Sequence, residues 1–341
     1  MNWKIQSPYN SLTGPHATHV VKALKDEYPE IWEYAVFHSS AAYPYQVMNS
    51  VNWLISEDVS VINISAGTDT NTTYDHMARY FDYVSMQNDI LFVMANTNWP
   101  NTENTHHVTY PGLSYNVLCV GSVNQNMVYQ PSGYEVAFQI SKPNLVDNCL
   151  RPDSGSCGTS FSAPRVSAKA ARLINTHPML KNNLPLLLSV IHTGSSISGI
   201  SGYSNDFDTT GFDKKVGAGF LDSSSANLIM QQEQFESLCF STFPDGIVLH
   251  YKDISVSQDG FMYVSVVTPL VVNKAGSYYR FQGYAPIQLK IYDNAILQGT
   301  YHQGNILYAG FHVSSGSNIV IEVSIVGAHP NREYDGALSW R

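Results

Sequence analysis

The chain carries little charge. Asp, Glu, Lys and Arg together make up 13% of its 341 residues, and the basic kind is scarcer, with 18 Lys and Arg against 27 Asp and Glu. There is no basic stripe and no run of like charges, so nucleic acid is not an expected partner. The resulting net charge of −9 mainly favours solubility.

Long apolar runs are absent as well. No hydrophobic stretch approaches the roughly 20 residues that a helix needs to cross a bilayer, so no membrane partner is expected. The polar segment after Met1 has no signal-peptide pattern, so the chain is either cytoplasmic or written without its leader. Hydrophobic residues still make up 44% of the sequence, which predicts a globular protein with one large and one smaller domain.

Cysteine is rare too, and four residues are too few for a fold built on disulfides. Cys149 and Cys157 lie eight positions apart in a polar loop with Pro, Gly and Ser, and they could pair. Cys119 lies in an apolar segment and predicts a buried thiol, whereas Cys239 has no evident partner. The redox compartment therefore stays open.

The first two thirds of the chain alternate between helical and strand patterns. Apolar residues at helical spacing run from Ala17 to Tyr28, and short apolar segments such as 59–65 and 90–95 have the length of buried strands. This alternation predicts an α/β fold with a mainly parallel sheet and helices on both faces. The other predicted helices lie near 47–55, 72–87, 160–174, 184–191 and 223–230, and the other strands at 34–37 and 117–120.

The pattern changes near residue 235. Ile287, Leu289 and Ile291 alternate with polar or half-polar residues, and so does the segment 319–325. Period-two alternation without helices predicts a jelly-roll-like β-sandwich of about 100 residues. We therefore expect two domains, over residues 1–234 and 235–341.

Ser160 is the candidate nucleophile. It lies in the segment Gly158-Thr-Ser-Phe-Ser-Ala-Pro164, at the start of a strongly predicted helix. Free backbone N–H groups and the helix dipole at such a position stabilise negative charge. A serine hydroxyl needs this help and a nearby base to react at neutral pH. The alternative is an ordinary helix-capping serine.

Two further side chains fit the same chemistry. His16 opens the first predicted helix and could act as a base, although it could also be an incidental polar residue. Asn98 follows a predicted buried strand, where its amide could donate to an oxyanion or simply form a turn. The His-Glu-x-x-His pattern of a zinc site is absent, so no metal ligands are expected.

In their order and spacing, these segments resemble the subtilase (subtilisin-like) family of serine peptidases. The serine motif resembles that family's nucleophile motif, and His16-Ala-Thr-His-Val20 resembles its histidine motif, with Ala17 in place of glycine. The resemblance runs from about residue 13 to 231. The other segments that carry it are Val61–Gly67, Tyr110–Val117, Val120–Val123 and Gly217–Asp222.

The resemblance implies a serine endopeptidase with a polypeptide substrate. Ser160 would be the nucleophile, His16 its base and Asn98 an oxyanion donor. The backbone of Ser65, Ala66 and Gly67 would pair with an extended substrate. The family also favours a secreted location. Members often bind calcium through loop carboxylates, of which Asp206 and Asp208 are examples, but we assign no cofactor. The oligomeric state is not predicted.

One member of the family's Asp-His-Ser triad is missing from its usual place. No Asp or Glu lies among the fifteen residues before His16. The first explanation is a truncated or split chain, and the others are a carboxylate from elsewhere or a degenerate enzyme. The alternative function is a catalytically impaired, subtilase-like protein that binds peptides. A third hypothesis is sugar or surface binding by tyrosines of the sandwich.

Overall fold

The computed structural model describes residues 2–6, 15–31, 33–37, 44–67, 72–98, 106–134, 140–241, 248–276, 278–283, 287–325 and 333–341. At its centre is a parallel sheet in the order β3-β4-β5-β7, and the short strand β6 pairs antiparallel with β5. The strands β1 and β2 form a separate parallel pair. The bounds are β1 Asn2–Gln6, β2 Glu33–Phe37, β3 Val61–Ile64, β4 Leu91–Ala95, β5 Leu118–Asn124, β6 Met127–Val128 and β7 Leu145–Asn148.

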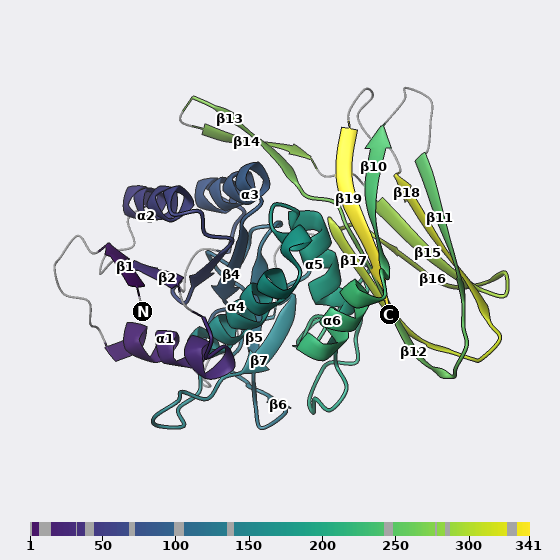
Figure 1. The fold of residues 1–341 in the computed structure, drawn as a ribbon, viewed down its shortest axis with the longest axis horizontal. Coiled ribbons are helices and arrows are strands. Elements are labelled where there is room, and N and C mark those ends of the chain that lie inside the picture. Colours follow the sequence, from purple (N-terminus) through teal and green to yellow (C-terminus); the bar gives the residue numbers. More distant parts are fainter. Residues whose placement is uncertain are drawn as a thin grey trace.

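Helices cover both faces of this sheet. Leu91 and Val93 of β4 pack in one core with α4, while Phe92 and Met94 pack in another with α2 and α3. Figure 1 shows the same division, with α2 and α3 on one side of the sheet and α1 with α4 on the other. The predicted α/β architecture is confirmed. The helices are α1 Pro15–Glu27, α2 Pro44–Ser56, α3 His76–Asn88, α4 Thr159–Thr176, α5 Leu184–Thr193 and α6 Ser223–Gln231, with a 3-10 turn at Pro178–Leu180.

The helix predicted from residue 72 begins later, at His76. The side chain of Asp75 accepts hydrogen bonds from the backbone N–H groups of Met77 and Ala78, at 3.0 and 2.9 Å. A carboxylate that caps the first turn fixes the start of a helix at the following residue. The periodic apolar pattern alone could not locate that start.

The C-terminal part is the predicted β-sandwich. Its two antiparallel sheets have the orders β10-β19-β12-β17 and β11-β18-β15-β16. Alternate residues of both sheets, such as Val264, Leu289 and Ile321, meet in a shared core. The strands are β10 Phe235–Ser241, β11 Val248–Ser255, β12 Gly260–Val267, β15 Ile287–Asp293, β16 Ile296–His302, β17 Ile306–Val313, β18 Asn318–Ile325 and β19 Glu333–Trp340.

The sandwich packs directly on α5. Every residue of this helix except Pro185 is buried, including His192, and such a helix must be covered by other parts of the protein. Val267, Tyr308 and Ala337 of the sandwich belong to the same hydrophobic core as the leucines of α5. Ser189 of α5 also donates to Ser265 O at 2.9 Å.

A hairpin extends from the sandwich and packs on α3, which covers one face of the parallel sheet, as Figure 1 shows. It consists of β13 (Val271–Ala275) and β14 (Tyr278–Gly283). The ring of Tyr279 lies between 5.1 and 5.5 Å from the rings of His76, Tyr80 and Tyr83 on α3. We call this hairpin the arm. The two remaining short strands, β8 (Ser195–Ser196) and β9 (Phe220–Leu221), pair with each other.

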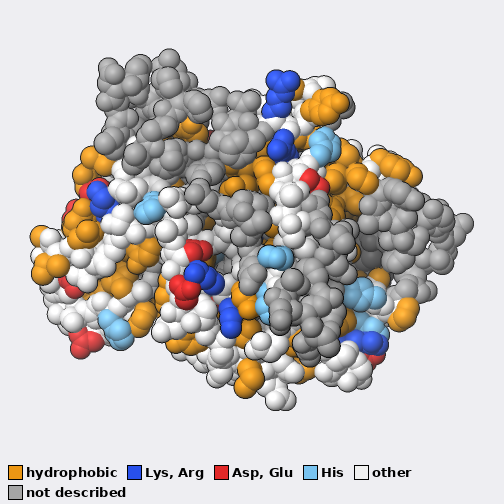
Figure 2. All heavy atoms as spheres, turned by 180° about the vertical axis from the view of Figure 1, so that it is seen from behind, with side chains coloured by type: hydrophobic (Ala, Val, Ile, Leu, Met, Phe, Trp, Pro, Cys, Tyr) orange, Lys and Arg blue, Asp and Glu red, His pale blue; other side chains and the backbone are white. Residues whose placement is uncertain are grey.

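Acidic and basic side chains of the described residues are interspersed with neutral ones on the face shown in Figure 2. None of the helices described here is long and apolar enough to cross a membrane.

Burial of His192 predicts an acid sensitivity. The surrounding core lowers the pKa of His192 from 6.5 to about 4, and its Nδ1–H donates to Leu188 O. The unfolded chain therefore binds this proton first, so stability is lost as the pH falls from 6.5 through 4. Urea unfolding at about pH 7 and about pH 4 should show a loss about 3 kcal/mol smaller in His192→Leu than in wild type. Equal losses in both proteins would contradict a neutral buried His192.

Candidate active site

Ser160 and His16 meet over one backbone oxygen. Ser160 is the second residue of α4, and its Oγ–H donates to Ser65 O at 3.4 Å. His16 is the second residue of α1, and its Nε2 lies 3.3 Å from the same oxygen. Because α1 packs against α4, two residues 144 positions apart in sequence reach one atom at the end of β3. The structure thus brings the predicted nucleophile and base together.

Ser65 is tied to the first turn of α4 by its side chain. Its Oγ–H donates to Ser160 O at 3.0 Å and its oxygen accepts from Asn63 Nδ2 at 2.9 Å. On its other side, Asn63 accepts from Ser167 Oγ of α4 at 3.2 Å. The sequence reading missed Asn63, although a polar side chain inside the apolar run VINIS was a usable signal.

The segment after β3 is open to solvent. Ala66 and Gly67 are exposed, and Ser65 is half-buried. Gly67 lies against the turn at Tyr110, where an added Cβ would come within 2.8 Å of Tyr110 O. A side chain at this position would push the two segments apart. Pairing of this backbone with an extended peptide stays a prediction.

Asn98 reaches the other side of Ser160. Its Oδ1 accepts from the backbone N–H of Thr159 at 3.0 Å, which points the amide NH2 group away from that bond. The N–H of Phe161 donates to Gly158 O at 2.9 Å. Among the described residues, the N–H of Ser160 has no hydrogen-bond acceptor. This N–H and the Asn98 amide are the two groups that could hold an oxyanion.

His16 has no carboxylate partner among the described residues, and its side chain is exposed. The acidic side chain that meets α1 is Asp153, which pairs with His19 at 3.2 Å. No group of three metal-binding side chains occurs in the part of the chain that the structure describes.

The structure agrees with the predictions made for the cysteines. Cys149 and Cys157 form a disulfide, so the pairing that the sequence left open is present. Cys119 is a buried thiol and Cys239 an exposed one. Burial raises the pKa of the Cys119 thiol to about 12. A thiol with so high a pKa stays protonated at neutral pH and is a poor nucleophile.

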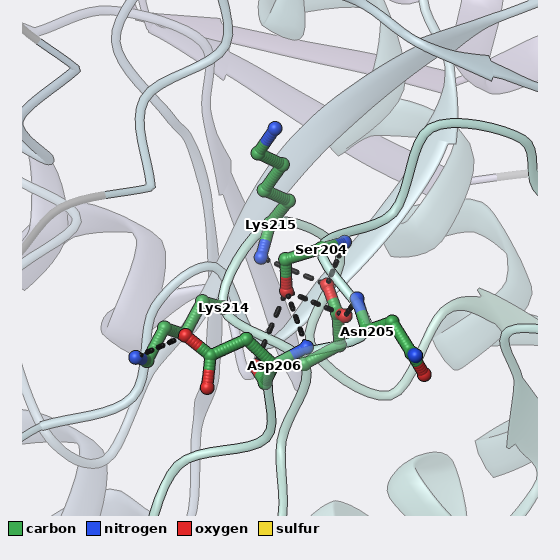
Figure 3. A network of polar contacts seen from close by, with 6 residues as sticks. Ser204, Asn205, Asp206, Lys214 and Lys215 are labelled. Carbon is green, nitrogen blue, oxygen red and sulfur yellow. Dashed lines mark hydrogen bonds and ion pairs between the residues drawn. The ribbon is translucent and has the colours of Figure 1, made fainter.

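The two carboxylates considered for calcium belong to a hydrogen-bonded loop near residue 210. Asp206 pairs with Lys214 at 2.5 Å, and Asp208 accepts from Ser141 Oγ and Thr210 N. Figure 3 shows Asp206 and Lys214 in this network, with Ser204, Asn205 and Lys215 beside them. Both carboxylates thus have protein partners in this structure.

Asp213 organises that loop from inside. It is 1% exposed and accepts from Ser204 Oγ at 2.7 Å and from the N–H groups of Asn205 and Lys215 at 2.9 Å each. The sequence reading missed this residue because loop carboxylates are usually solvated.

More than half of the chain is similar to one family of known proteins. The model of the subtilase family matches residues 30–219, a range that includes Ser65–Gly67, Asn98 and Ser160 but begins after His16. Subtilisin of Bacillus pumilus is 26% identical over 183 residues, which are 49% of this chain and 66% of that protein. Subtilisin E of Bacillus subtilis strain 168 is 25% identical, over 49% of this chain and 47% of that protein. The chain therefore spans less than two thirds of these relatives.

Two solved structures are similar in part. Tripeptidyl peptidase 2 aligns with 96% of this chain and 40% of its own, at a TM-score of 0.48 and 11% identity. The epidermin leader peptide processing serine protease of Staphylococcus aureus aligns over 60% of each chain, at a TM-score of 0.45 and 16% identity. The family match covers more than half of the residues, and on that basis the chain belongs to the subtilase family.

Proposed function

We propose that this protein is a serine endopeptidase, with Ser160 as nucleophile and His16 as general base. The observation that carries the proposal is the convergence of both side chains on Ser65 O. A nucleophile and a base must lie within hydrogen-bond reach of each other, and apo structures often hold them loosely. To complete that contact, His16 Nε2 would release Ser65 O, to which only its N–H can donate, and would accept the hydrogen bond of the Ser160 hydroxyl instead.

The surrounding groups support the remaining steps. A peptide that pairs with the backbone of Ser65–Gly67 would present its carbonyl carbon to Ser160. The Asn98 amide and the Ser160 N–H would donate to the oxyanion as the tetrahedral intermediate forms. His16 would then pass its proton to the leaving amine.

The second candidate is a protein that binds peptides through the same backbone segment, Ser65–Gly67, without hydrolysing them. The observation in its favour is the exposed His16 without a carboxylate partner among the described residues. Loss of the orienting carboxylate favours the wrong imidazole tautomer and lowers turnover about 10⁴-fold in the chymotrypsin-type triad. Backbone pairing at Ser65–Gly67 does not depend on His16.

Incubation with a fluorophosphonate, followed by intact-mass measurement, tests the proposal. We expect one adduct on wild type and none on Ser160→Ala, because only an activated hydroxyl attacks phosphorus at a useful rate. Ser162→Ala is the matched control, since Ser162 lies two residues on in the same turn, is fully buried and donates to Asp147 O. Absence of an adduct on wild type, together with binding of an unfolded peptide, would support the binding protein instead.

A further inference from the structure

The loop before the nucleophile is closed covalently. The Cys149–Cys157 disulfide joins its two ends, and Ser160 follows three residues later. Backbone hydrogen bonds brace the same loop, from Arg151 N to Ser156 O at 2.7 Å and from Gly158 N to Cys149 O at 3.1 Å. We call residues 149–157 the disulfide loop. A loop closed in this way holds its side chains in few arrangements.

The disulfide loop grips the helix that carries His16. Arg151 Nη2 lies 2.5 Å from His19 Nε2, so this nitrogen accepts from the guanidinium, and Asp153 Oδ2, the carboxylate partner of Arg151, lies 3.2 Å from the same nitrogen. Arg151 also binds Asp153 at 2.6 Å, and hydrogen bonding to Arg151 lowers the pKa of that carboxyl. The side chain of His19 is only 15% exposed. It lies one turn after His16, so its contacts restrain the turn that carries the candidate base.

The far end of α1 is attached to the same unit. Arg165 of α4 donates to Leu150 O of the disulfide loop at 3.3 Å and lies 4.0 Å from Glu27, the last residue of α1. The loop, α1 and α4 therefore contact one another pairwise. His16 itself makes only the 3.3 Å contact with Ser65 O among its described polar contacts, so its position depends on how α1 is held.

We propose that Arg151 and Asp153 are positioning residues for the candidate base: by holding His19, they hold His16 within reach of Ser160. This inference rests on the proposed function. We call the contacts of Arg151 and Asp153 at His19 the clasp. The clasp holds α1, whereas the backbone proposed to pair with the peptide lies after β3. Loosening it should therefore lower kcat and leave KM nearly unchanged. A displacement of a catalytic group by about 1 Å can lower the rate about 100-fold.

The test compares His19→Leu with His19→Gln. Leucine cannot accept from Arg151, whereas the side-chain oxygen of glutamine can. We expect kcat on an unfolded peptide to fall about 10- to 100-fold in His19→Leu and to stay within about threefold in His19→Gln. The kcat of Asp153→Ala should fall by a similar factor. The kcat of the double variant His19→Leu/Asp153→Ala should be no lower than that of the less active single variant. Glu30→Gln removes the exposed pair with Arg172 just beyond α1 and should change nothing.

Amide hydrogen exchange of residues 19–23, whose N–H groups have acceptors within α1, separates the clasp from the chemistry. We expect at least about tenfold faster exchange in His19→Leu than in wild type or Glu30→Gln. Unchanged exchange and unchanged kcat in His19→Leu would overturn the clasp and leave the peptidase proposal intact. No fluorophosphonate adduct on wild type would overturn the peptidase and the catalytic role of the clasp, while faster exchange in His19→Leu would still show that the loop holds α1.

Discussion

Removal of residues 235–341 is expected to unfold the rest of the chain. The cut uncovers the side of α5 that contacts β10, β12, β17 and β19, and it removes Val267, Tyr308 and Ala337 from the core that they share with the leucines of α5. Each leucine side chain transferred to water loses about 1.5–3 kcal/mol, and several together match the 5–15 kcal/mol that stabilises a typical domain. Circular dichroism of residues 1–234 during heating should show no cooperative transition, and the fragment should aggregate.

A single glycine at the same junction offers a graded version of this test. Gly211 has a φ of +92°, and an added Cβ would lie 1.7 Å from Tyr308 O of the sandwich. Gly199 has a similar φ of +80° but no atom within 4 Å of the same position. Gly211→Ala should therefore destabilise the protein much more than Gly199→Ala, since only the former pushes the two parts apart. Cooperative unfolding of residues 1–234 alone, with equal effects of the two alanines, would show that the sandwich is dispensable for stability.

Asp82→Ala is expected to lower the free energy of unfolding by about 3–5 kcal/mol. The carboxylate is fully buried and accepts from Tyr74 Oη at 2.8 Å, Tyr115 N at 3.1 Å and Asn116 N at 2.7 Å. Removing it deprives one half-buried hydroxyl and two buried backbone N–H groups of this acceptor. It also removes the anion whose field offsets the buried ammonium of Lys142, which is 3% exposed. Burial raises the pKa of Asp82 and lowers that of Lys142, so both charges depend on their surroundings.

The matched control is Asp58→Asn, which removes an ion pair with Lys181 at 2.7 Å where the carboxylate side chain is 84% exposed, and asparagine keeps the φ of 56° at this position. An exposed pair of this kind contributes about 1 kcal/mol or less. Urea unfolding at neutral pH measures both variants. A loss at Asp82 as small as that at Asp58 would mean that water or a side-chain shift replaces the missing acceptor.

Most of the fold could be predicted because its signals are local. The buried strand β4 is a continuous apolar run, and β15 and β18 alternate between core and surface, so each pattern follows from the faces that are covered. The division after residue 234 stays a prediction. The core that includes Leu187 and Val267 crosses it.

What the sequence did not show depends on contacts between distant residues. Asp82 and Lys142 would be assigned to the surface by type, and only the fold shows their buried partners. The sequence assigns His19 no role, because its partners Arg151 and Asp153 lie more than 130 positions away along the chain. The same holds for Tyr279, whose α3 neighbours lie about 200 residues earlier. The periodicity of hydrophobic residues in a short segment carries no information about contacts between segments that are far apart in sequence.

The arm has a consequence for how this protein could be rebuilt. Leu270 exchanges two hydrogen bonds with Asn116 at the base of the arm, and Tyr279 sits among the rings of α3 near its tip. Any other module grafted after α6 would have to supply a matching hairpin as well as a surface for α5. The C-terminal part therefore cannot be replaced as an independent module. Replacement by the corresponding part of a homologue would require residues 1–234 and 235–341 to be exchanged together.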